Sequence, residues 1–269
     1  MNNKGPILYA ETIGNGDRTI VFIHGNSQSH SIWDKVILEI PNKESYSLIS
    51  VDLPGHGASF RSDEPEKDYS IQGMSSKLKN FIIDAVPTES EFIVVATSLG
   101  TNLVGEIADT FSKCRGFFFV SPCIIGSGFT TSDLFQPNPN IAPFFTANPK
   151  PEDLNNLLDD LLVSNDYKIR EEIKADYLKT DSRFRENWFA SVLKAEYTDE
   201  IAKLKSTGKP IAILFGEQEK FCNTSYLNNS SLNLWKAQTI LIPNAGHATP
   251  YDNPSAIAAL LTEFIDDIN

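Results

Sequence analysis

Short apolar runs alternate with longer amphipathic stretches along most of the chain. The runs are rich in Val, Ile and Phe, as expected for strands covered on both faces of a parallel sheet. The predicted strands span residues 7–12, 18–23, 47–51, 91–96, 116–120, 210–215 and 238–242. Helical patterns fall at residues 70–85, 102–111 and 254–268. This alternation predicts βαβ units and an α/β fold with a doubly wound, mostly parallel sheet.

The alternation stops after residue 122 and resumes near residue 199. In between, a loop rich in Pro and Phe is followed by helical patterns at residues 151–163, 166–179 and 182–197. We therefore predict a core of residues 1–122 and 199–269 and an inserted helical cap subdomain of residues 123–198. An ordinary decoration of loops and helices is the alternative, but the many aromatic residues favour a cap that lines a pocket.

Charge and hydropathy limit the partners of the chain. Its 269 residues carry a formal net charge of −12, which disfavours nucleic acid and anionic membrane surfaces as partners. The N-terminus has no apolar segment typical of a signal peptide, and no later apolar run reaches membrane-spanning length. We expect a soluble, cytoplasmic protein that acts on a small molecule.

The three cysteines, Cys114, Cys123 and Cys222, are an odd number without CxxC spacing. This pattern supports neither a disulfide framework nor a structural zinc site, and reduced, buried thiols are expected instead. Cys123 and Cys222 follow predicted strands near the candidate site described next.

Ser98 lies in the stretch ATSLG at residues 96–100, between an apolar run and a helical pattern. A serine flanked by small residues two positions away, on a strand-to-helix turn, is the nucleophile-elbow pattern G-x-S-x-G, here with Ala in the first place. The turn is tight, so bulky flanking residues would collide with the neighbouring strand or helix. Ser98 is therefore the candidate nucleophile.

A serine nucleophile needs a base and an acid that orients the base. Glu219 follows a strand that ends at Gly216, and His247 follows the last predicted strand. Ser98, Glu219 and His247 thus occur in the chain order Ser, acid, His that is typical of one large class of hydrolases. Glu217 is the nearby alternative for the acid, and Asp133 is a more distant one.

Another predicted strand ends in a His-Gly turn at His24. In serine hydrolases of this topology, such a turn supplies one N–H group of the oxyanion hole. The donors would be the backbone N–H groups of Asn26 and Leu99. His24 itself is expected to be a packed turn residue. We assign a structural role to the loop DLPGHGAS at residues 52–59, in which His56 is expected to satisfy local hydrogen bonds.

Taken together, these segments resemble the α/β-hydrolase superfamily. The resemblance rests on residues 24–26, 52–57, the elbow around Ser98, residues 216–219 and residues 246–247. Within the superfamily, the chain is most similar to small capped hydrolases that include enzymes degrading N-acyl homoserine lactones. That likeness rests on residues 24–27, 233–235 and 244–248 and on glutamate at position 219. The chain departs from those enzymes at Ala96-Thr97, where they carry Gly-Trp, and in the cap.

The resemblance implies an α/β-hydrolase fold and a serine hydrolase that cleaves an ester or lactone with an apolar acyl portion. In this interpretation Ser98 attacks, His247 transfers the proton and Glu219 orients His247, without metal or cofactor. Phe144 and Phe145 of the Phe-rich loop would bind the acyl chain. A hydrolase of C–C bonds, a ligand receptor with vestigial turnover and a hydroxynitrile lyase are the alternatives.

Overall fold

The computed structural model describes residues 8–126 and 128–268. At its centre is a seven-stranded sheet in the order β1-β3-β2-β4-β5-β6-β7. The strands are β1 (Ala10–Ile13), β2 (Arg18–Ile23), β3 (Tyr46–Val51), β4 (Phe92–Thr97), β5 (Cys114–Val120), β6 (Ile211–Gly216) and β7 (Ile240–Ile242). β1 pairs antiparallel with β3, and all other neighbours pair in parallel. The strand order reverses between β2 and β4, where ligands of open α/β sheets bind.

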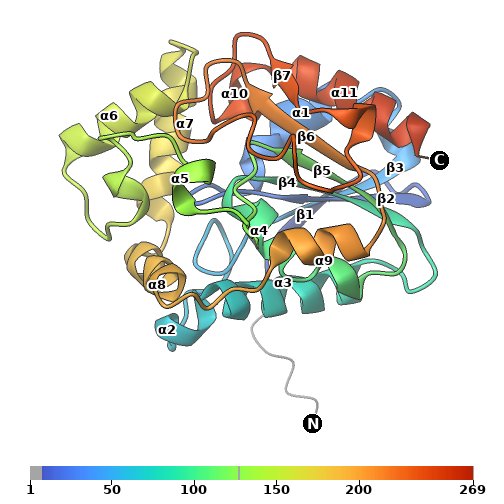
Figure 1. Cartoon of the computed structure of the whole chain (residues 1–269), viewed down its shortest axis with the longest axis horizontal. Helices are drawn as coiled ribbons and strands as arrows, with labels where there is room; N and C mark the ends of the chain where they lie inside the picture. Colours follow the sequence, from blue (N-terminus) through green and yellow to red (C-terminus); the bar gives the residue numbers. More distant parts are fainter. Residues whose placement is uncertain (1–7, 127, 269) are drawn as a thin grey trace.

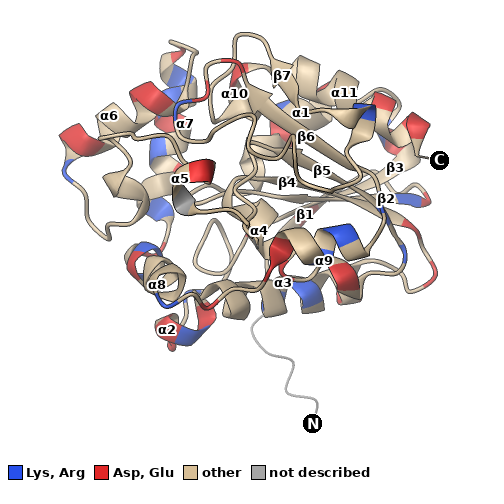
Figure 2. Cartoon of the chain, in the orientation of Figure 1, with Lys and Arg blue, Asp and Glu red and all other residues tan. Residues whose placement is uncertain are grey.

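The central strands are buried along their whole length. Every residue of β4 and β6 is buried, and so is every residue of β2 except the first. Figure 2 shows that most Lys, Arg, Asp and Glu residues lie on the outer helices and loops, and the three within the strands, Glu11, Arg18 and Arg115, are exposed. Burial on both faces explains why these strands read as continuous apolar runs.

Helices cover both faces of the sheet (Figure 1). α1 (Asp34–Glu39) and α11 (Pro254–Asp267) lie on one face, and α3 (Ile71–Ala85), α4 (Leu99–Gly105) and α9 (Glu200–Ser206) on the other. This arrangement confirms the predicted fold class.

The helix predicted over residues 102–111 is wrong in its bounds. α4 begins already at Leu99 and ends at Gly105, and a 3₁₀ turn, η3 (Ala108–Thr110), follows. The helix starts early because the sharp turn at Ser98 leads directly into it. At its end, a Cβ on Gly105 would lie 2.7 Å from the side chain of Glu200, so this close approach requires glycine, a poor helix former.

Five helical elements lie between β5 and α9 in the described part of the chain. They are α5 (Thr131–Leu134), η4 (Ala142–Phe144), α6 (Pro151–Leu161), α7 (Tyr167–Lys179) and α8 (Ser182–Leu193). In Figure 1, α5 to α8 form a group beside the sheet. We call residues 123–198 the cap segment; that it is a separate subdomain stays a prediction. None of the helices in the described part of the chain is long and apolar enough to span a membrane.

Other predicted elements need only small corrections at their ends. The first strand begins at Ala10 within the described residues, whereas part of its predicted range, residue 7, lies outside them. In the cap segment, α8 ends at Leu193, four residues before the predicted end at residue 197. The short helices α1, α2 (Pro65–Asp68), α9 and α10 (Thr249–Asp252) carry patterns too brief to predict from periodicity.

Candidate active site

Ser98 stands at the end of β4 in a strained conformation. Its φ is 49° and its ψ is −125°, which is rare for a residue with a side chain. Two glycines allow the surrounding backbone to close in. A Cβ on Gly100 would lie 2.6 Å from the carbonyl oxygen of His24, and one on Gly25 would lie 2.9 Å from the Cβ of Ser98. The turn after β2 is thus pressed against the serine.

His247 and Glu219 complete a chain of hydrogen bonds that begins at Ser98. The Oγ of Ser98 lies 3.0 Å from Nε2 of His247, and Nδ1 of His247 lies 2.8 Å from Oε2 of Glu219. The carboxylate can only accept, so Nδ1 carries the proton and Nε2 is free to accept from the serine. The backbone N–H groups of Phe221 and Cys222 donate to Oε1 of Glu219 at 2.8 and 3.3 Å. Both carboxylate oxygens therefore have partners.

The surroundings of Glu219 and His247 keep Glu219 ionised and allow His247 to take up a proton. Burial opposes charge on Glu219, but the positive charge and hydrogen bond of His247 and the two backbone donors outweigh it, so the pKa of Glu219 is below its ordinary value. Burial likewise opposes charge on His247, but the carboxylate of Glu219 outweighs it and raises the pKa of His247. An ion pair is thereby favoured when His247 takes up a proton.

The two alternative acids lie away from the histidine. Glu217 is exposed, and its backbone N–H donates to Ile242 at the end of β7. Asp133 is exposed and accepts from the N–H and hydroxyl of Thr130 at 2.7 and 2.6 Å. The structure therefore brings Glu219, and neither of these carboxylates, to His247.

The remaining histidines serve the loops around the site. His24 and His56 are fully buried, and the N–H groups of Leu53 and Ser27 donate to their Nε2 atoms at 2.9 and 3.1 Å. Burial lowers the pKa of both histidines, most strongly that of His56. This agrees with the structural role expected for His24 and His56.

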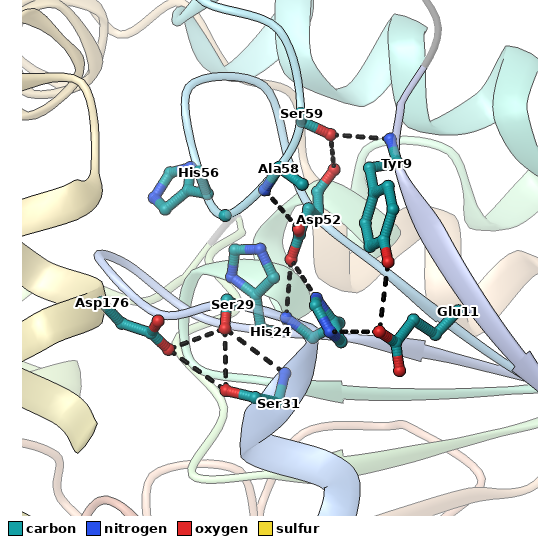
Figure 3. Close-up of polar contacts among 12 residues, drawn as sticks. Tyr9, Glu11, His24, Ser29, Ser31, Asp52, His56, Ala58, Ser59 and Asp176 are labelled. Carbon is teal, nitrogen blue, oxygen red and sulfur yellow. Dashed lines mark hydrogen bonds and ion pairs between the residues drawn. The ribbon is translucent and has the colours of Figure 1, made fainter.

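Asp52 organises the loop of residues 52–59, a role that the sequence analysis did not assign to it. Its carboxylate is fully buried and accepts from the backbone N–H and Nδ1 of His30 at 2.7 and 2.9 Å and from the N–H of Ala58 at 2.7 Å. Burial opposes its charge, but these hydrogen bonds outweigh burial and hold the pKa of Asp52 far below its usual range. Figure 3 shows Asp52 at the centre of this network, with Ser59 and Tyr9 beside it.

Within the described residues, two backbone N–H groups near Ser98 have no hydrogen-bond partner. Leu99 is the first residue of α4, so its N–H has no partner within the helix. No hydrogen bond from the backbone N–H of Asn26 occurs among residues 8–126 and 128–268. Asn26 directly follows Gly25, which abuts Ser98. Its side-chain amide is tied down, because Nδ2 donates to the carbonyl oxygen of Phe144 at 3.0 Å.

A cavity of about 900 Å³ opens over Ser98 and is lined mostly by apolar side chains. Asn26, Ser98 and His247 lie in its lining. The walls from the cap segment are rich in aromatic and aliphatic residues: Phe129, Phe135, Ile141, Phe144, Phe145, Trp188, Phe189 and Val192. The ring of Phe145 stacks on that of Trp188, with centroids 5.6 Å apart, and contacts the ring of Phe189, with centroids 4.5 Å apart. Both phenylalanines predicted to bind substrate therefore line the cavity.

Two polar residues of the cap segment that the sequence analysis missed hold the loop after β2. Arg185 is 2% exposed, and its guanidinium donates to Oγ of Ser27 at 3.0 Å. Ser27 in turn donates to Oδ1 of Asn26 at 2.7 Å. Asp176 accepts from the hydroxyls of Ser29 and Ser31 at 2.7 and 3.3 Å (Figure 3).

Local sequence does not distinguish these residues from ordinary charged residues on a helix surface. Arg183, two positions before Arg185 on the same helix, is exposed and pairs with Asp181. A weak signal exists for the apolar wall, because Trp188, Phe189 and Val192 share one side of α8 at helical spacing.

Cys222 presents a ligand atom near the histidine and the acid. The ligand atoms of Glu219, Cys222 and His247 all lie within 4.8 Å of one another. Nδ1 of His247 and Oε2 of Glu219 already bind each other, so a cation here would have to break that hydrogen bond. Glu219 and His247 therefore fit a proton relay with Ser98 better than a resident metal site with Cys222.

Comparisons with known proteins identify the family and support the fold. The alpha/beta hydrolase family pattern matches residues 20–260. Human monoacylglycerol lipase ABHD6 is 23% identical over 265 residues, covering 93% of this chain and 76% of that protein. The pimeloyl-(acyl-carrier protein) methyl ester esterase of Nitrosomonas europaea is 24% identical over 254 residues, covering 90% and 92%. The solved structure of N-acyl homoserine lactonase AidH with N-butanoyl homoserine superposes with a TM-score of 0.86 at 23% identity, covering 97% of this chain and 93% of that one.

Proposed function

Because the chain belongs to the alpha/beta hydrolase family and is a carboxylic ester hydrolase of that type, we propose that it cleaves esters or lactones with an apolar acyl portion through Ser98, His247 and Glu219. The observation that carries the proposal is the continuous hydrogen-bond chain of 3.0 and 2.8 Å at the floor of an apolar cavity. A serine alone is a weak nucleophile, and this chain supplies the base and the acid that activate it.

In the proposed reaction, Oγ of Ser98 attacks the carbonyl carbon while Nε2 of His247 takes the hydroxyl proton. The negative charge that develops on the carbonyl oxygen is stabilised by the N–H groups of Asn26 and Leu99. Loss of one such donor typically costs about 3–4 kcal/mol in the transition state. His247 then gives its proton to the leaving alkoxide, and an acyl-serine ester remains.

A water molecule completes the cycle by the same proton transfers. His247 takes a proton from the water, whose oxygen attacks the acyl-serine, and then returns the proton to Ser98 as the carboxylic acid leaves. Glu219 stays ionised throughout and stabilises the imidazolium form of His247. In a lactone the leaving alkoxide stays attached to the acyl group, so ring opening needs no further chemistry.

Within this class, we propose N-acyl homoserine lactones as substrates. The support is the glutamate at position 219, the turn at Asn26 and the overall likeness to a solved lactonase. A neutral lactone also suits a chain of net charge −12, because repulsion does not hinder its approach. Esters of apolar acids are the coarser class that the relatives named as lipase and esterase support.

The test is a panel of N-acyl homoserine lactones and p-nitrophenyl esters of matched acyl lengths, measured with the wild-type protein and with Ser98→Ala. We expect multiple turnovers on both series and a loss on the order of 10⁴-fold or more in Ser98→Ala. Brisk ester cleavage with lactone opening at the spontaneous rate would overturn the lactonase proposal alone. Undiminished ester cleavage by Ser98→Ala would overturn the assigned nucleophile.

A further inference from the structure

Two thiols meet beside the candidate nucleophile, although they lie 99 positions apart in the sequence. Sγ of Cys123 is 3.6 Å from Sγ of Cys222. Cys123 follows β5 and Cys222 follows β6, and both side chains line the cavity. Sγ of Cys123 is also 4.0 Å from Oγ of Ser98. Small molecules that reach the serine can therefore reach this pair.

The two thiols are chemically unequal. The two thiols share a hydrogen bond in which either sulfur can donate, and this bond favours the thiolate form of Cys123, whose pKa is lowered despite its burial. The hydrogen bond to Cys123 and burial together raise the pKa of Cys222. The pair thus combines one cysteine whose thiolate form is favoured and can react with an electrophile and one neighbouring thiol, at an Sγ–Sγ distance of 3.6 Å, that can resolve the product.

Cys114 provides an internal contrast. It is buried in β5, donates to the carbonyl oxygen of Gly116 at 3.4 Å and does not line the cavity. Burial raises its pKa to about 12. It has neither the access to the cavity that the pair has nor the favoured thiolate form of Cys123.

We propose that Cys123 and Cys222 form an oxidation site that takes a peroxide and stores the oxidation as a disulfide, which reversibly stops ester hydrolysis. In the first step the Cys123 thiolate attacks one peroxide oxygen; with hydrogen peroxide, the O–O bond breaks and water leaves after protonation. Cys123 then carries a sulfenic acid. In the second step the sulfur of Cys222 attacks the sulfur of Cys123, and a second water leaves. Two thiols lose two electrons and two protons, and the peroxide gains them.

Disulfide formation strains the site because the sulfurs must move closer. A disulfide needs a separation of about 2.05 Å, so the sulfurs must approach by roughly 1.5 Å. The Cys123 side resists movement: its backbone N–H donates to Oγ1 of Thr101 at 3.0 Å, and its carbonyl oxygen accepts from Nδ2 of Asn102 at 2.6 Å. Both partners belong to α4, the helix that Ser98 begins. The carbonyl oxygen of Cys222 is held as well, by Nε2 of Gln136 at 2.7 Å, so closing the disulfide shifts Cys222 along with Cys123.

Movement of Cys222 affects the acid and the base directly. Its backbone N–H donates to Oε1 of Glu219, and at 3.3 Å this is the longer of the two backbone bonds that orient the carboxylate. The preceding residue, Phe221, packs edge-on against the ring of His247 with centroids 5.4 Å apart. A displaced Cys222 loosens the orientation of Glu219 and His247 together, so turnover falls even though Ser98 is chemically intact.

This inference goes beyond the proposed function and does not depend on the natural substrate. Its effect on turnover rests on the roles proposed for Glu219 and His247, but the oxidation itself is measured separately by counting thiols. Failure of the thiol chemistry and failure of the catalytic assignment are therefore distinguishable.

The experiment treats the full-length protein with stepwise hydrogen peroxide in the presence of a metal chelator. Free thiols are counted after unfolding, the cross-linked peptides are identified by mass spectrometry, and turnover of p-nitrophenyl acetate is followed. We expect the thiols to fall from three to one, with a Cys123–Cys222 cross-link and at least a tenfold loss of turnover on the same time course. Dithiothreitol should restore both.

Two variants test the role of the pair. Cys114→Ala should lose two thiols and respond like the wild type. Cys222→Ala lacks the resolving thiol, so prolonged peroxide should convert Cys123 to a sulfinic acid, and dithiothreitol should no longer restore turnover. A disulfide that leaves turnover unchanged would overturn the switch. Thiols that never cross-link, or full recovery of Cys222→Ala with dithiothreitol, would overturn the oxidation site.

Discussion

The floor and the walls of the cavity are held together by different forces. On the floor, Ser98, His247 and Glu219 are joined by hydrogen bonds of 3.0 and 2.8 Å, and Glu219 has two further backbone donors. The walls from the cap segment are mainly aromatic rings in contact, such as Phe145 stacked on Trp188. Hydrogen bonds fix atoms to a few tenths of an ångström, whereas apolar contacts tolerate changes of shape.

Under the proposed function, this difference places the chemical step on the floor and the selectivity in the walls. A change on the floor should lower turnover for every substrate, because each reaction uses the same proton transfers. A change in the walls should alter which acyl chain is preferred and leave the chemical step intact. Arg185 connects the two, since it lies on the cap segment and reaches Asn26 through Ser27.

The largest effect in this comparison is expected for Glu219→Gln. The amide keeps the size of the side chain but removes the charge that stabilises protonated His247, so kcat should fall by about 10²–10⁴-fold for short and long esters alike. Steady-state kinetics across acyl lengths measure it. Glu217→Gln is the matched control and should stay close to wild type, because Glu217 is exposed. The reverse ranking of the two variants would show that Glu217 is the acid.

Arg185→Met tests whether the cap segment supports the floor. Without the guanidinium, Ser27 loses a donor that holds it beside Asn26. A misplaced Asn26 N–H weakens the oxyanion hole, so we expect about a tenfold lower kcat on p-nitrophenyl acetate with little change in KM. Its acyl group is too short to depend on the walls.

The control for this prediction is Asp176→Ala, which removes the hydrogen bonds to Ser29 and Ser31 and leaves Asn26 tied to Ser27. Thermal unfolding of both variants reports their stability. If both lose kcat equally, general loosening of the cap segment is responsible, and Arg185 has no separate link to the oxyanion hole.

The pH dependence gives a further test of the floor. His247 must be neutral to accept the proton of Ser98, and Glu219 raises the pKa of His247 above its ordinary value. Activity should therefore be full above that pKa and fall about tenfold per pH unit below it. In the residual activity of Glu219→Gln, the fall should begin at a lower pH. An acid limb that does not move would mean that Glu219 does not set the pKa of His247.

The floor could be predicted from sequence because its residues follow strands. Ser98, Glu219 and His247 each come shortly after β4, β6 and β7, and the ends of parallel strands meet at one edge of the sheet. Short motifs therefore carried enough information to bring distant residues together. The same reasoning placed Asn26 after β2.

The cap segment could be predicted only as helical and aromatic. How its helices pack depends on contacts between α6, α7, α8 and the core that no local pattern encodes. Buried Arg185 satisfies its guanidinium with backbone carbonyl oxygens, such as those of Thr146 and Ala147 at 2.9 and 2.8 Å, and with Ser27. Such partners leave no signature in the sequence. The contact between Cys123 and Cys222 could not be predicted either, because strand order alone does not set the direction of a side chain.

The smallest effect is expected for the walls themselves. Phe145 lies in the cavity lining against Trp188 and Phe189, so Phe145→Ala should enlarge the space for an acyl chain. Each buried CH₂ contributes about 0.8 kcal/mol, or about fourfold in kcat/KM, so the wild type should favour longer chains until the cavity is filled. The variant should reach its optimum at a longer chain and change by only a few-fold on p-nitrophenyl acetate. Phe118→Leu, a change in the buried core away from the cavity lining, is the control and should keep the wild-type optimum. If Phe145→Ala keeps that optimum as well, Phe145 supports Trp188 and Phe189 without contacting the acyl chain, and selectivity must lie elsewhere in the wall.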